Sequence, residues 1–169
     1  MASDSPQALA AAPYVRMAKT DERAASPKLD GGARGRLAAA LDVPDVVAVS
    51  LFGSHARGQA GALSDVDLGV WLDAELPAEE RHARRLELTV AATRALGGGE
   101  VDLVVLNDAT PLLRHRALRD GQRLVERDPV ARVRLETRAL LEYLDTTSLR
   151  ATLATGVKHR IEEGRFGRP

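Results

Sequence analysis

The sequence has no cysteine, few aromatic residues and no excess of either charge. The lack of cysteine excludes disulfides, thiolate catalysis and zinc sites built on cysteine. Aromatic residues make up 3% of the chain, which argues against a surface for stacking nucleic-acid bases. Basic and acidic side chains number 24 each, so no net charge attracts nucleic acid or an anionic membrane.

Long apolar runs are also absent. No stretch reaches the ~20 apolar residues that span a bilayer, and the N-terminus lacks the basic and apolar regions of a signal peptide. We therefore expect a cytoplasmic protein that binds no membrane and for which nucleic acid is an unlikely partner. The 169 residues are enough for one compact domain with a core of its own.

The pattern of residues divides the chain into three parts. Residues 1–32 mix Ala, Ser, Pro and charge without a sustained period, which predicts a disordered or loosely ordered N-terminal arm. Residues 33–146 carry alternating apolar runs and turn signals, which predict the folded domain. Residues 147–169 are predicted to be a mildly basic C-terminal tail.

Strands and helices are predicted in alternation within the folded domain. Apolar and β-branched runs predict strands at 46–52, 65–72, 101–106 and, at an edge, 122–125. Proline, acidic and glycine signals predict helices at 33–42, from 77 to the glycines at 97–99, at 111–119 and from 129 to 145. This order predicts an α/β (α+β) fold, with helices packed on a small mixed sheet.

Two of these helices carry apolar residues at helical spacing. Ala83, Leu86 and Val90 fall on one face of the helix that begins near residue 77. In the last helix, the spacing of Val133, Leu140 and Leu144, with Leu141 beside them, is that of one helical stripe, which is predicted to face the core.

Two aspartates stand at the head of the second predicted strand. Asp65 and Asp67 alternate with Val66, so both project from the same face. Like charges this close resist ionisation unless a cation lies between them, and carboxylate oxygens suit Mg²⁺. Taken alone, the pattern is more often that of a solvated acidic strand end.

A Gly-Ser turn ends the strand before these aspartates. Gly53 allows a sharp turn and a close approach of phosphate to the backbone, while the Ser54 hydroxyl and nearby N–H groups can face an anion. Such turns are common by themselves. Next to the paired acids, however, this one indicates an anion holder beside a metal holder.

A third acid opens the third predicted strand. Asp102 faces Asp65 and Asp67 if its strand is the neighbour of the second strand. Three carboxylates around two metal ions about 3.5–4 Å apart form the clamp used for in-line nucleotidyl transfer. The alternative is an ordinary acid at a strand edge.

The spacing of these motifs resembles a known signature. Gly53-Ser54, the ten residues 55–64 and Asp65-Val66-Asp67 are similar to the G-S-x-D-x-D signature of the DNA polymerase beta-like nucleotidyltransferase superfamily. Within that superfamily, GSHARG, SDVDLGVWL and VDLVVLN resemble minimal nucleotidyltransferases (MNT proteins). GQRLVERD and RLETRALLEYLD resemble the C-terminal part of MNT antitoxins that are paired with HEPN-domain toxins. The resemblance covers about residues 34–146, so the folded domain is expected to have the nucleotidyltransferase fold.

The resemblance implies a role for each matching residue. Asp65 and Asp67 would bind the metal ions, and Asp102 would be the third ligand and the base for the attacking hydroxyl. Gly53 and Ser54 would hold the triphosphate. Arg57 keeps two alternatives: it contacts phosphate, or it pairs with an acid and braces the turn.

The resemblance also implies a reaction and a partner. Such an enzyme would use Mg²⁺, as two ions or with Mn²⁺ in its place, to transfer AMP from ATP to a tyrosine of its cognate HEPN toxin, acting as an antitoxin. Residues 112–118 and the C-terminal helix are predicted docking surfaces for that partner. The alternatives are a nucleotidyltransferase acting on a small molecule such as an aminoglycoside, and a module that covers its toxin without catalysis.

The four histidines do not share a metal-ligand spacing. His55 lies in the Gly-Ser turn, where a contact with ligand is one alternative. The others, His82, His115 and His159, are predicted to lie on the surface.

Overall fold

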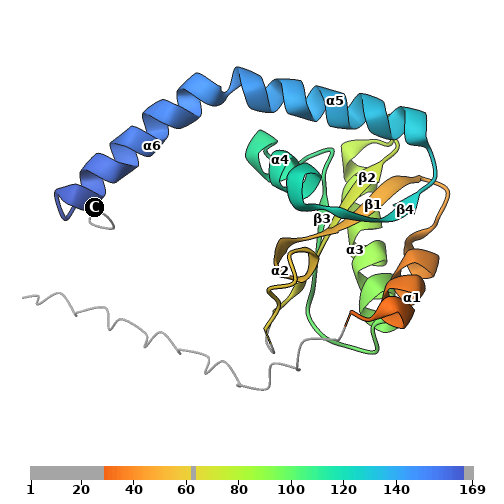
Figure 1. The fold of residues 1–169 in the computed structure, drawn as a ribbon. Coiled ribbons are helices and arrows are strands. Elements are labelled where there is room, and N and C mark those ends of the chain that lie inside the picture. The colour runs from red at the N-terminus through yellow and green to blue at the C-terminus, as the bar shows by residue number, and fades with distance from the viewer. Residues whose placement is uncertain (1–28, 62–63, 166–169) are drawn as a thin grey trace, which may run out of the picture.

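The computed structural model describes residues 29–61 and 64–165 (Figure 1). In chain order, the elements are α1 (Gly31–Leu41), β1 (Val46–Phe52), α2 (Gly53–Ala56), β2 (Val66–Leu72), α3 (Ala78–Ala95), β3 (Val101–Val105), α4 (Pro111–Asp120), β4 (Gln122–Glu126), α5 (Pro129–Asp145) and α6 (Thr147–Glu162). None of the helices in this part of the chain is long and apolar enough to cross a membrane.

The strands form one mixed sheet in the order β3-β2-β1-β4. The central strand β1 is antiparallel to both β2 and β4, whereas β2 and β3 are parallel. A parallel pair needs a long crossover, and α3 with its flanking loops provides it. The predicted α/β fold with a small mixed sheet is confirmed.

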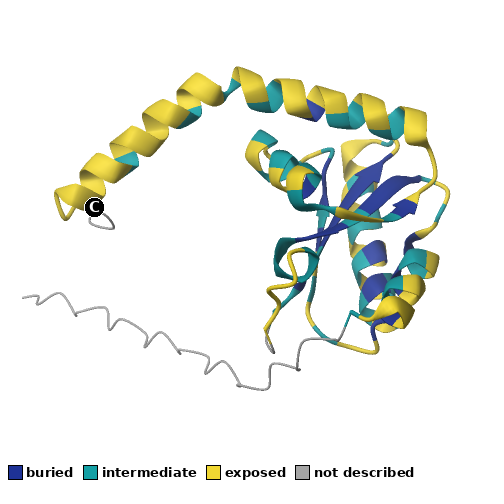
Figure 2. Ribbon diagram, viewed as in Figure 1, coloured by how far each residue is buried: buried dark blue, intermediate teal, exposed yellow. Residues whose placement is uncertain are grey.

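Helices cover both faces of the sheet (Figures 1 and 2). One core cluster joins α1 and α3 to side chains of alternate strand positions, including Leu37, Leu68 and Leu88. The other joins α4 and α5 to the opposite face, through residues such as Trp71 and Ala139. Because side chains alternate along a strand, Asp67 lies on the same sheet face as Trp71, the face that α4 and α5 cover.

Side-chain caps fix where several helices begin. The Asp30 carboxylate accepts a hydrogen bond from the Ala33 N–H at 2.7 Å and starts α1. The Asp128 carboxylate accepts hydrogen bonds from the N–H groups of Val130 and Ala131 at the start of α5. Pro129, which has no N–H to donate, occupies the first turn of this helix. The predicted start of this helix at residue 129 is confirmed.

The boundaries of the two terminal parts differ from the predictions. Residues 1–28 of the expected N-terminal arm lie outside the described residues, but residues 31 and 32 already belong to α1, because Asp30 caps the helix there. The predicted tail contains α6, a helix of 16 residues. Its apolar residues are spread thinly among Thr, Arg and Gly, which is why the sequence pattern did not predict a helix.

The predicted core stripe of α5 is wrong. Its four members are 44–57% exposed, and the face that packs against the sheet is marked by the fully buried Ala139. On α3, Leu86 and Val90 are also exposed, while Leu88 and Ala92 are buried. On α5 the small Ala139 occupies the buried position, and the larger apolar residues of the predicted stripe remain on the surface. On α3 the buried face includes Leu88 and is offset from the predicted one.

A three-layer stack sets the direction of α6 where it leaves α5. The His115 ring of α4 stacks on the Tyr143 ring of α5, with centroids 3.8 Å apart and planes 4° from parallel. The Arg150 guanidinium lies 3.7 Å from the Tyr143 ring centroid, and it donates to the Thr146 hydroxyl. His115, predicted at the surface, is therefore half-buried, and α6 then extends away from the sheet (Figure 1).

Candidate active site

The Gly-Ser turn forms at the end of β1, as a helix of one turn that packs against an aspartate. Gly53 has a φ of +68°, a conformation that L side chains rarely adopt. A Cβ at Gly53 would lie 1.9 Å from Oδ2 of Asp67. Glycine is thus required twice at this position, for its conformation and for the space that the Asp67 carboxylate occupies.

The sheet register brings two of the predicted acids together. Asp67 pairs with Phe52 on β1 and with Asp102 on β3. Adjacent residues of a parallel pair point to the same face, so both carboxylates project on the side of the turn. Asp65 lies two positions before Asp67, immediately ahead of β2, and is half-buried.

The electrostatics of the acids agree with this convergence. Burial raises the pKa of Asp67 above its usual value, and the negative charges of Asp102 and Asp65 raise it further. The positive charges of His55 and Arg57 lower the pKa of Asp67 but do not outweigh these causes. Among the described residues, no lysine or arginine forms an ion pair with Asp67 or Asp102. A bound cation would therefore reduce the repulsion between these carboxylates.

His55 connects the turn to the chain that precedes Asp65. Its Nε2 lies 3.3 Å from the carbonyl oxygen of Ser64. The contact holds the turn of residues 53–56 against the loop that leads into β2. This is a structural role for the one histidine that the sequence places in the turn.

Arg57 shows the second of its two predicted contacts. Its Nη1 lies 3.5 Å from Oδ2 of Asp120, at the end of α4, and its Nε donates to the Gln59 side chain. The guanidinium is 45% exposed, so it braces the turn while part of it faces solvent. A contact with phosphate remains a prediction.

Sequence reasoning missed two residues that shape the site. Asp120 and Gln122 contact the turn from the junction of α4 and β4. It also missed Asn107, which supports the opposite end of β2: its side chain accepts from the Leu72 N–H and donates to the Leu72 carbonyl. No spacing rule marks these residues, because they act on segments far away in the sequence.

The carboxylates fit a magnesium ion that is shared with a substrate. No group of three His, Asp or Glu side chains in the described part of the chain is arranged to enclose a metal ion by itself. Mg²⁺ commonly takes only one or two protein carboxylates and completes its shell with water and substrate phosphates. The acid donors, the raised pKa of Asp67 and the adjoining backbone turn suit that kind of site.

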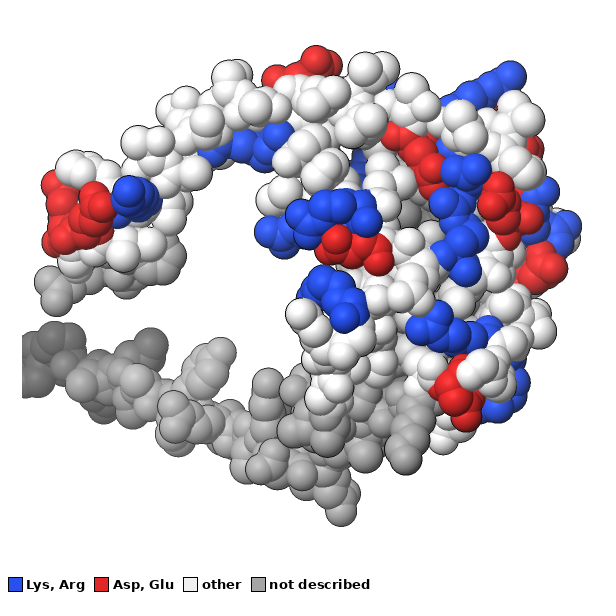
Figure 3. Space-filling view, viewed as in Figure 1, with Lys and Arg blue, Asp and Glu red and all other residues white. Residues whose placement is uncertain are grey.

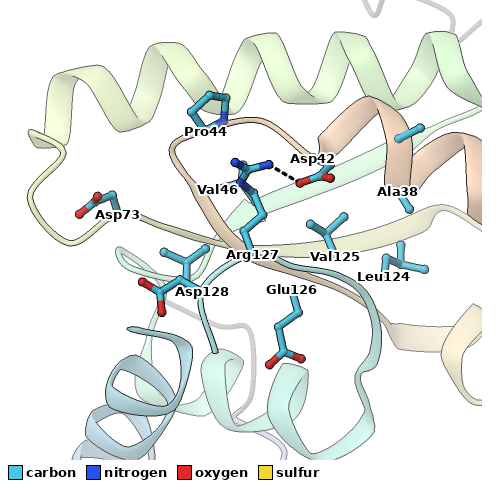
Figure 4. Close-up of a pocket in the computed structure, with 12 residues that line it drawn as sticks. Ala38, Asp42, Pro44, Val46, Asp73, Leu124, Val125, Glu126, Arg127 and Asp128 are labelled. Carbon is cyan, nitrogen blue, oxygen red and sulfur yellow. Dashed lines mark hydrogen bonds and ion pairs between the residues drawn. The ribbon is translucent and has the colours of Figure 1, made fainter. Parts of the chain in front are cut away.

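A large hollow lies at the opposite end of β1 (Figure 4). Its volume is about 700 Å³, and α1, β4 and the loops after them line it. Figure 4 shows Asp42 of this hollow joined to Arg127, at 2.7 Å. Size alone would favour this hollow, but its acids already have partners within the protein.

Comparisons with known proteins agree with the motifs. A family model described as polymerase beta, nucleotidyltransferase matches residues 38–130, more than half of the chain. A search of curated protein sequences finds no match.

Several solved structures share the fold. A toxin–antitoxin structure with AMP-PNP is 23% identical with a TM-score of 0.61, and the match covers 74% of this chain and 98% of that one. A mutant of the toxin–antitoxin MntA-HpeT is 20% identical with a TM-score of 0.60 and the same coverage of both chains. A structure from Shewanella oneidensis is 18% identical with a TM-score of 0.56, and the match covers 76% of this chain and 99% of that one. The family match, the Gly-Ser turn and the acids on β2 and β3 agree, and the chain belongs to the polymerase beta family of nucleotidyltransferases.

Proposed function

We propose that this chain is an MNT-type antitoxin that transfers AMP from ATP to a tyrosine hydroxyl of a cognate HEPN-domain toxin. The observation that carries the proposal is the convergence of Asp67 and Asp102 beside the Gly53 turn. Solved structures of the same fold are described as toxin–antitoxin structures, one of them with the ATP analogue AMP-PNP. Because ATP is the donor, we place the reaction in the cytoplasm.

The roles of the residues follow from their positions. Asp65 and Asp67, with Asp102 as a third ligand, would hold Mg²⁺, which supplies charge neutralisation of the triphosphate and acidifies a bound hydroxyl. The backbone at Gly53 and the Ser54 hydroxyl would bind the phosphates. Asp102 is more exposed than Asp67, and we assign it the proton of the attacking hydroxyl.

The reaction is a displacement at the α-phosphorus of ATP. The acceptor oxygen forms a bond to the α-phosphorus of ATP, the bond from that phosphorus to the β-phosphate bridging oxygen breaks, and pyrophosphate leaves. The hydroxyl proton passes to the Asp102 carboxylate. The acceptor comes from another protein, because the domain of residues 33–146 provides no second lobe to enclose a small acceptor.

Intact-mass spectrometry tests the transfer. The chain is incubated with ATP, Mg²⁺ and a candidate HEPN partner protein, and we expect AMP-sized additions to that partner at tyrosine. The Asp102→Asn variant should bind ATP better than Asp67→Asn does, yet transfer no AMP. The opposite outcome has two parts: the partner stays unmodified, and the Asp65→Asn/Asp67→Asn double variant still inhibits it. That outcome would show that the chain inhibits its toxin by binding alone, and it would exclude the enzyme.

Calorimetry tests the metal separately. The acids repel a triphosphate until a cation neutralises them, so ATP should bind measurably only with Mg²⁺ or Mn²⁺. Equal affinity for ATP in EDTA and in Mg²⁺ would contradict the assignment of Asp65, Asp67 and Asp102 as metal ligands.

A further inference from the structure

The one-turn helix α2 is held from outside by the short segment that joins α4 to β4. We propose that Asp120 and Gln122 of this segment are positioning residues, which fix the phosphate-facing turn of residues 53–58 for nucleotide binding. We call the contacts of Asp120 and Gln122 with this turn the brace. The brace itself is inferred from contacts within the chain, whereas its effect on ATP binding rests on the proposed function.

Gln122 grips the end of α2 directly. Its Nε2 donates to the carbonyl oxygen of Ala56, the last residue of the helix, at 2.5 Å. Its Oε1 accepts from Nη1 of Arg34 on α1 at 2.5 Å, which fixes the orientation of the amide. One side chain therefore ties α2 to both β4 and α1.

Asp120 grips the same turn through Arg57. Its Oδ2 lies 3.5 Å from Nη1 of Arg57, and the Arg119 guanidinium donates to both of its oxygens at 2.7 and 2.8 Å. Arg119, with a smaller contribution from Arg57, holds the pKa of Asp120 below its usual value. The carboxylate is thus charged at neutral pH and can hold the turn. Figure 3 shows the resulting alternation of basic and acidic side chains over α4 and α2.

Gly121 fixes the path of the main chain between these two side chains. Its backbone is extended, so the glycine is needed for space and not for an unusual conformation. A Cβ at Gly121 would lie 2.2 Å from the carbonyl oxygen of Ala117 and 3.3 Å from Cβ of Ser50. The segment therefore runs tightly between α4 and β1, and the positions of Asp120 and Gln122 follow from that path.

The turn needs such support because it is too short to hold itself. A helix of four residues pays the cost of nucleation and gains few internal hydrogen bonds. Its own bonds are the Arg57 N–H to Gly53 at 3.3 Å, the Gly58 N–H to His55 at 3.4 Å and the Gln59 N–H to Ser54 at 2.9 Å. Phosphate-binding groups that are fixed in advance lose less freedom on binding, which strengthens binding.

Hydrogen exchange measured by mass spectrometry tests the brace without ATP. In Gln122→Ala and Asp120→Asn, we expect the amides of residues 57–59 to exchange about fivefold faster, as the loss of one net hydrogen bond implies. The central amides of β1 should be unchanged. Arg36→Ala is the control for Gln122→Ala, because Arg36 also donates to a carbonyl at a helix end, that of Ala95. Asp42→Asn is the control for Asp120→Asn, because it breaks another Arg–Asp pair far from the turn.

Nucleotide binding gives the second readout. We expect the KM for ATP to rise about fivefold in the two brace variants, with a smaller change in kcat and a melting temperature lowered by no more than about 4 °C. Asp120→Glu, which keeps the charge, should restore part of the affinity. Wild-type exchange rates in residues 57–59 of both brace variants would overturn the inference. If the native chain neither binds ATP nor transfers AMP, the proposed function fails, while the exchange measurement still decides the brace.

Discussion

The two ends of the central sheet both carry several aspartates, but they use them in opposite ways. At the far end, Asp45 is held by both nitrogens of the Arg84 fork, at 2.5 and 2.7 Å, and Asp42 is paired with Arg127. At the site end, Asp67 lies beside Asp102 and Asp65, and like charge raises its pKa.

At the far end the acids are neutralised by arginines, whereas at the site end like charges lie close together. A carboxylate neutralised by arginine contributes to folding and has little left to offer a cation. Carboxylates brought together by strand register repel one another, and the fold tolerates the repulsion where a cation is bound in function. The hollow at the far end is therefore a weaker candidate for the functional site than the acid cluster beside the Gly53 turn.

The largest expected effect comes from removing charge at each end in turn. Asp67→Asn should reduce AMP transfer at least about a hundred-fold, because the proposed metal site would lose one of its ligands. Asp45→Asn should leave transfer unchanged, because Asp45 serves only Arg84. Initial rates of AMP incorporation measure both. If Asp67→Asn and Asp45→Asn lost AMP transfer equally, the acids at the two ends of the sheet would not differ in function.

Glycine substitutions give the next largest effect. Gly53→Ala places a methyl group against Asp67, whereas Gly58→Ala has the same φ of +68° but open space around its Cβ. Both should lose about 1–2 kcal/mol of stability through the left-handed conformation, and Gly53→Ala should lose more. We expect transfer to fall about tenfold or more in Gly53→Ala alone. Urea denaturation and initial rates provide the measurements, and equal behaviour of the two variants would contradict the close packing at Gly53.

Stability should respond in opposite directions at the two ends. Asp67 has a raised pKa in the folded state, so its ionised form opposes folding at neutral pH, and that penalty disappears as the pH falls below the unfolded value. In EDTA at pH 7, Asp67→Asn should therefore melt higher than the native chain, and the difference should shrink toward pH 4. Asp45→Asn should lower the free energy of unfolding by about 1–2 kcal/mol at neutral pH, because the Arg84 fork loses its charged acceptor. Thermal melts from pH 4 to 8 decide, and a lower melting temperature for Asp67→Asn would make that aspartate a structural acid.

The smallest effect is expected where an ion pair is most exposed. Asp42 and Arg127 are 51% and 40% exposed, so water already solvates much of both charges. Asp42→Asn should change the free energy of unfolding by less than about 0.5 kcal/mol. A larger loss, measured by urea denaturation, would show that the far end depends on this pair.

The sequence predicted most strands well because apolar, β-branched runs bounded by turn residues leave little ambiguity. The strand at 46–52 agrees with β1 at both ends, and Asp65, predicted within the second strand, lies just before β2. The neighbouring placement of Asp102 was conditional on strand order, and the register of β2 with β3 satisfies the condition. Local patterns predict elements, but long-range pairing is needed to bring Asp67 and Asp102 together.

Helix faces were harder to predict than strands. On α5, the stripe of larger apolar residues was taken for the core side, but Ala139 marks the true contact with the sheet. Hydrophobic periodicity does not show which of two candidate faces is covered, because small residues can lie closer to a sheet than leucines can. The brace by Asp120 and Gln122 depends on contacts with residues more than sixty positions away, which no local pattern contains.

The parallel pairing of β2 with β3 also has a consequence for the order of folding. The antiparallel strands β1 and β2 are joined by a short connection, whereas β3 reaches β2 only after the chain has closed a loop that includes the whole of α3. Closing a long loop costs more entropy and is slower than forming a local pair. We therefore expect Asp102 to meet Asp67 late, so that repulsion between them slows the last step of assembly and not the collapse of the core. A chain that ends within α3 would retain one pair of strands, but it would lack Asp102 and the residues that brace the turn, so it would have no site.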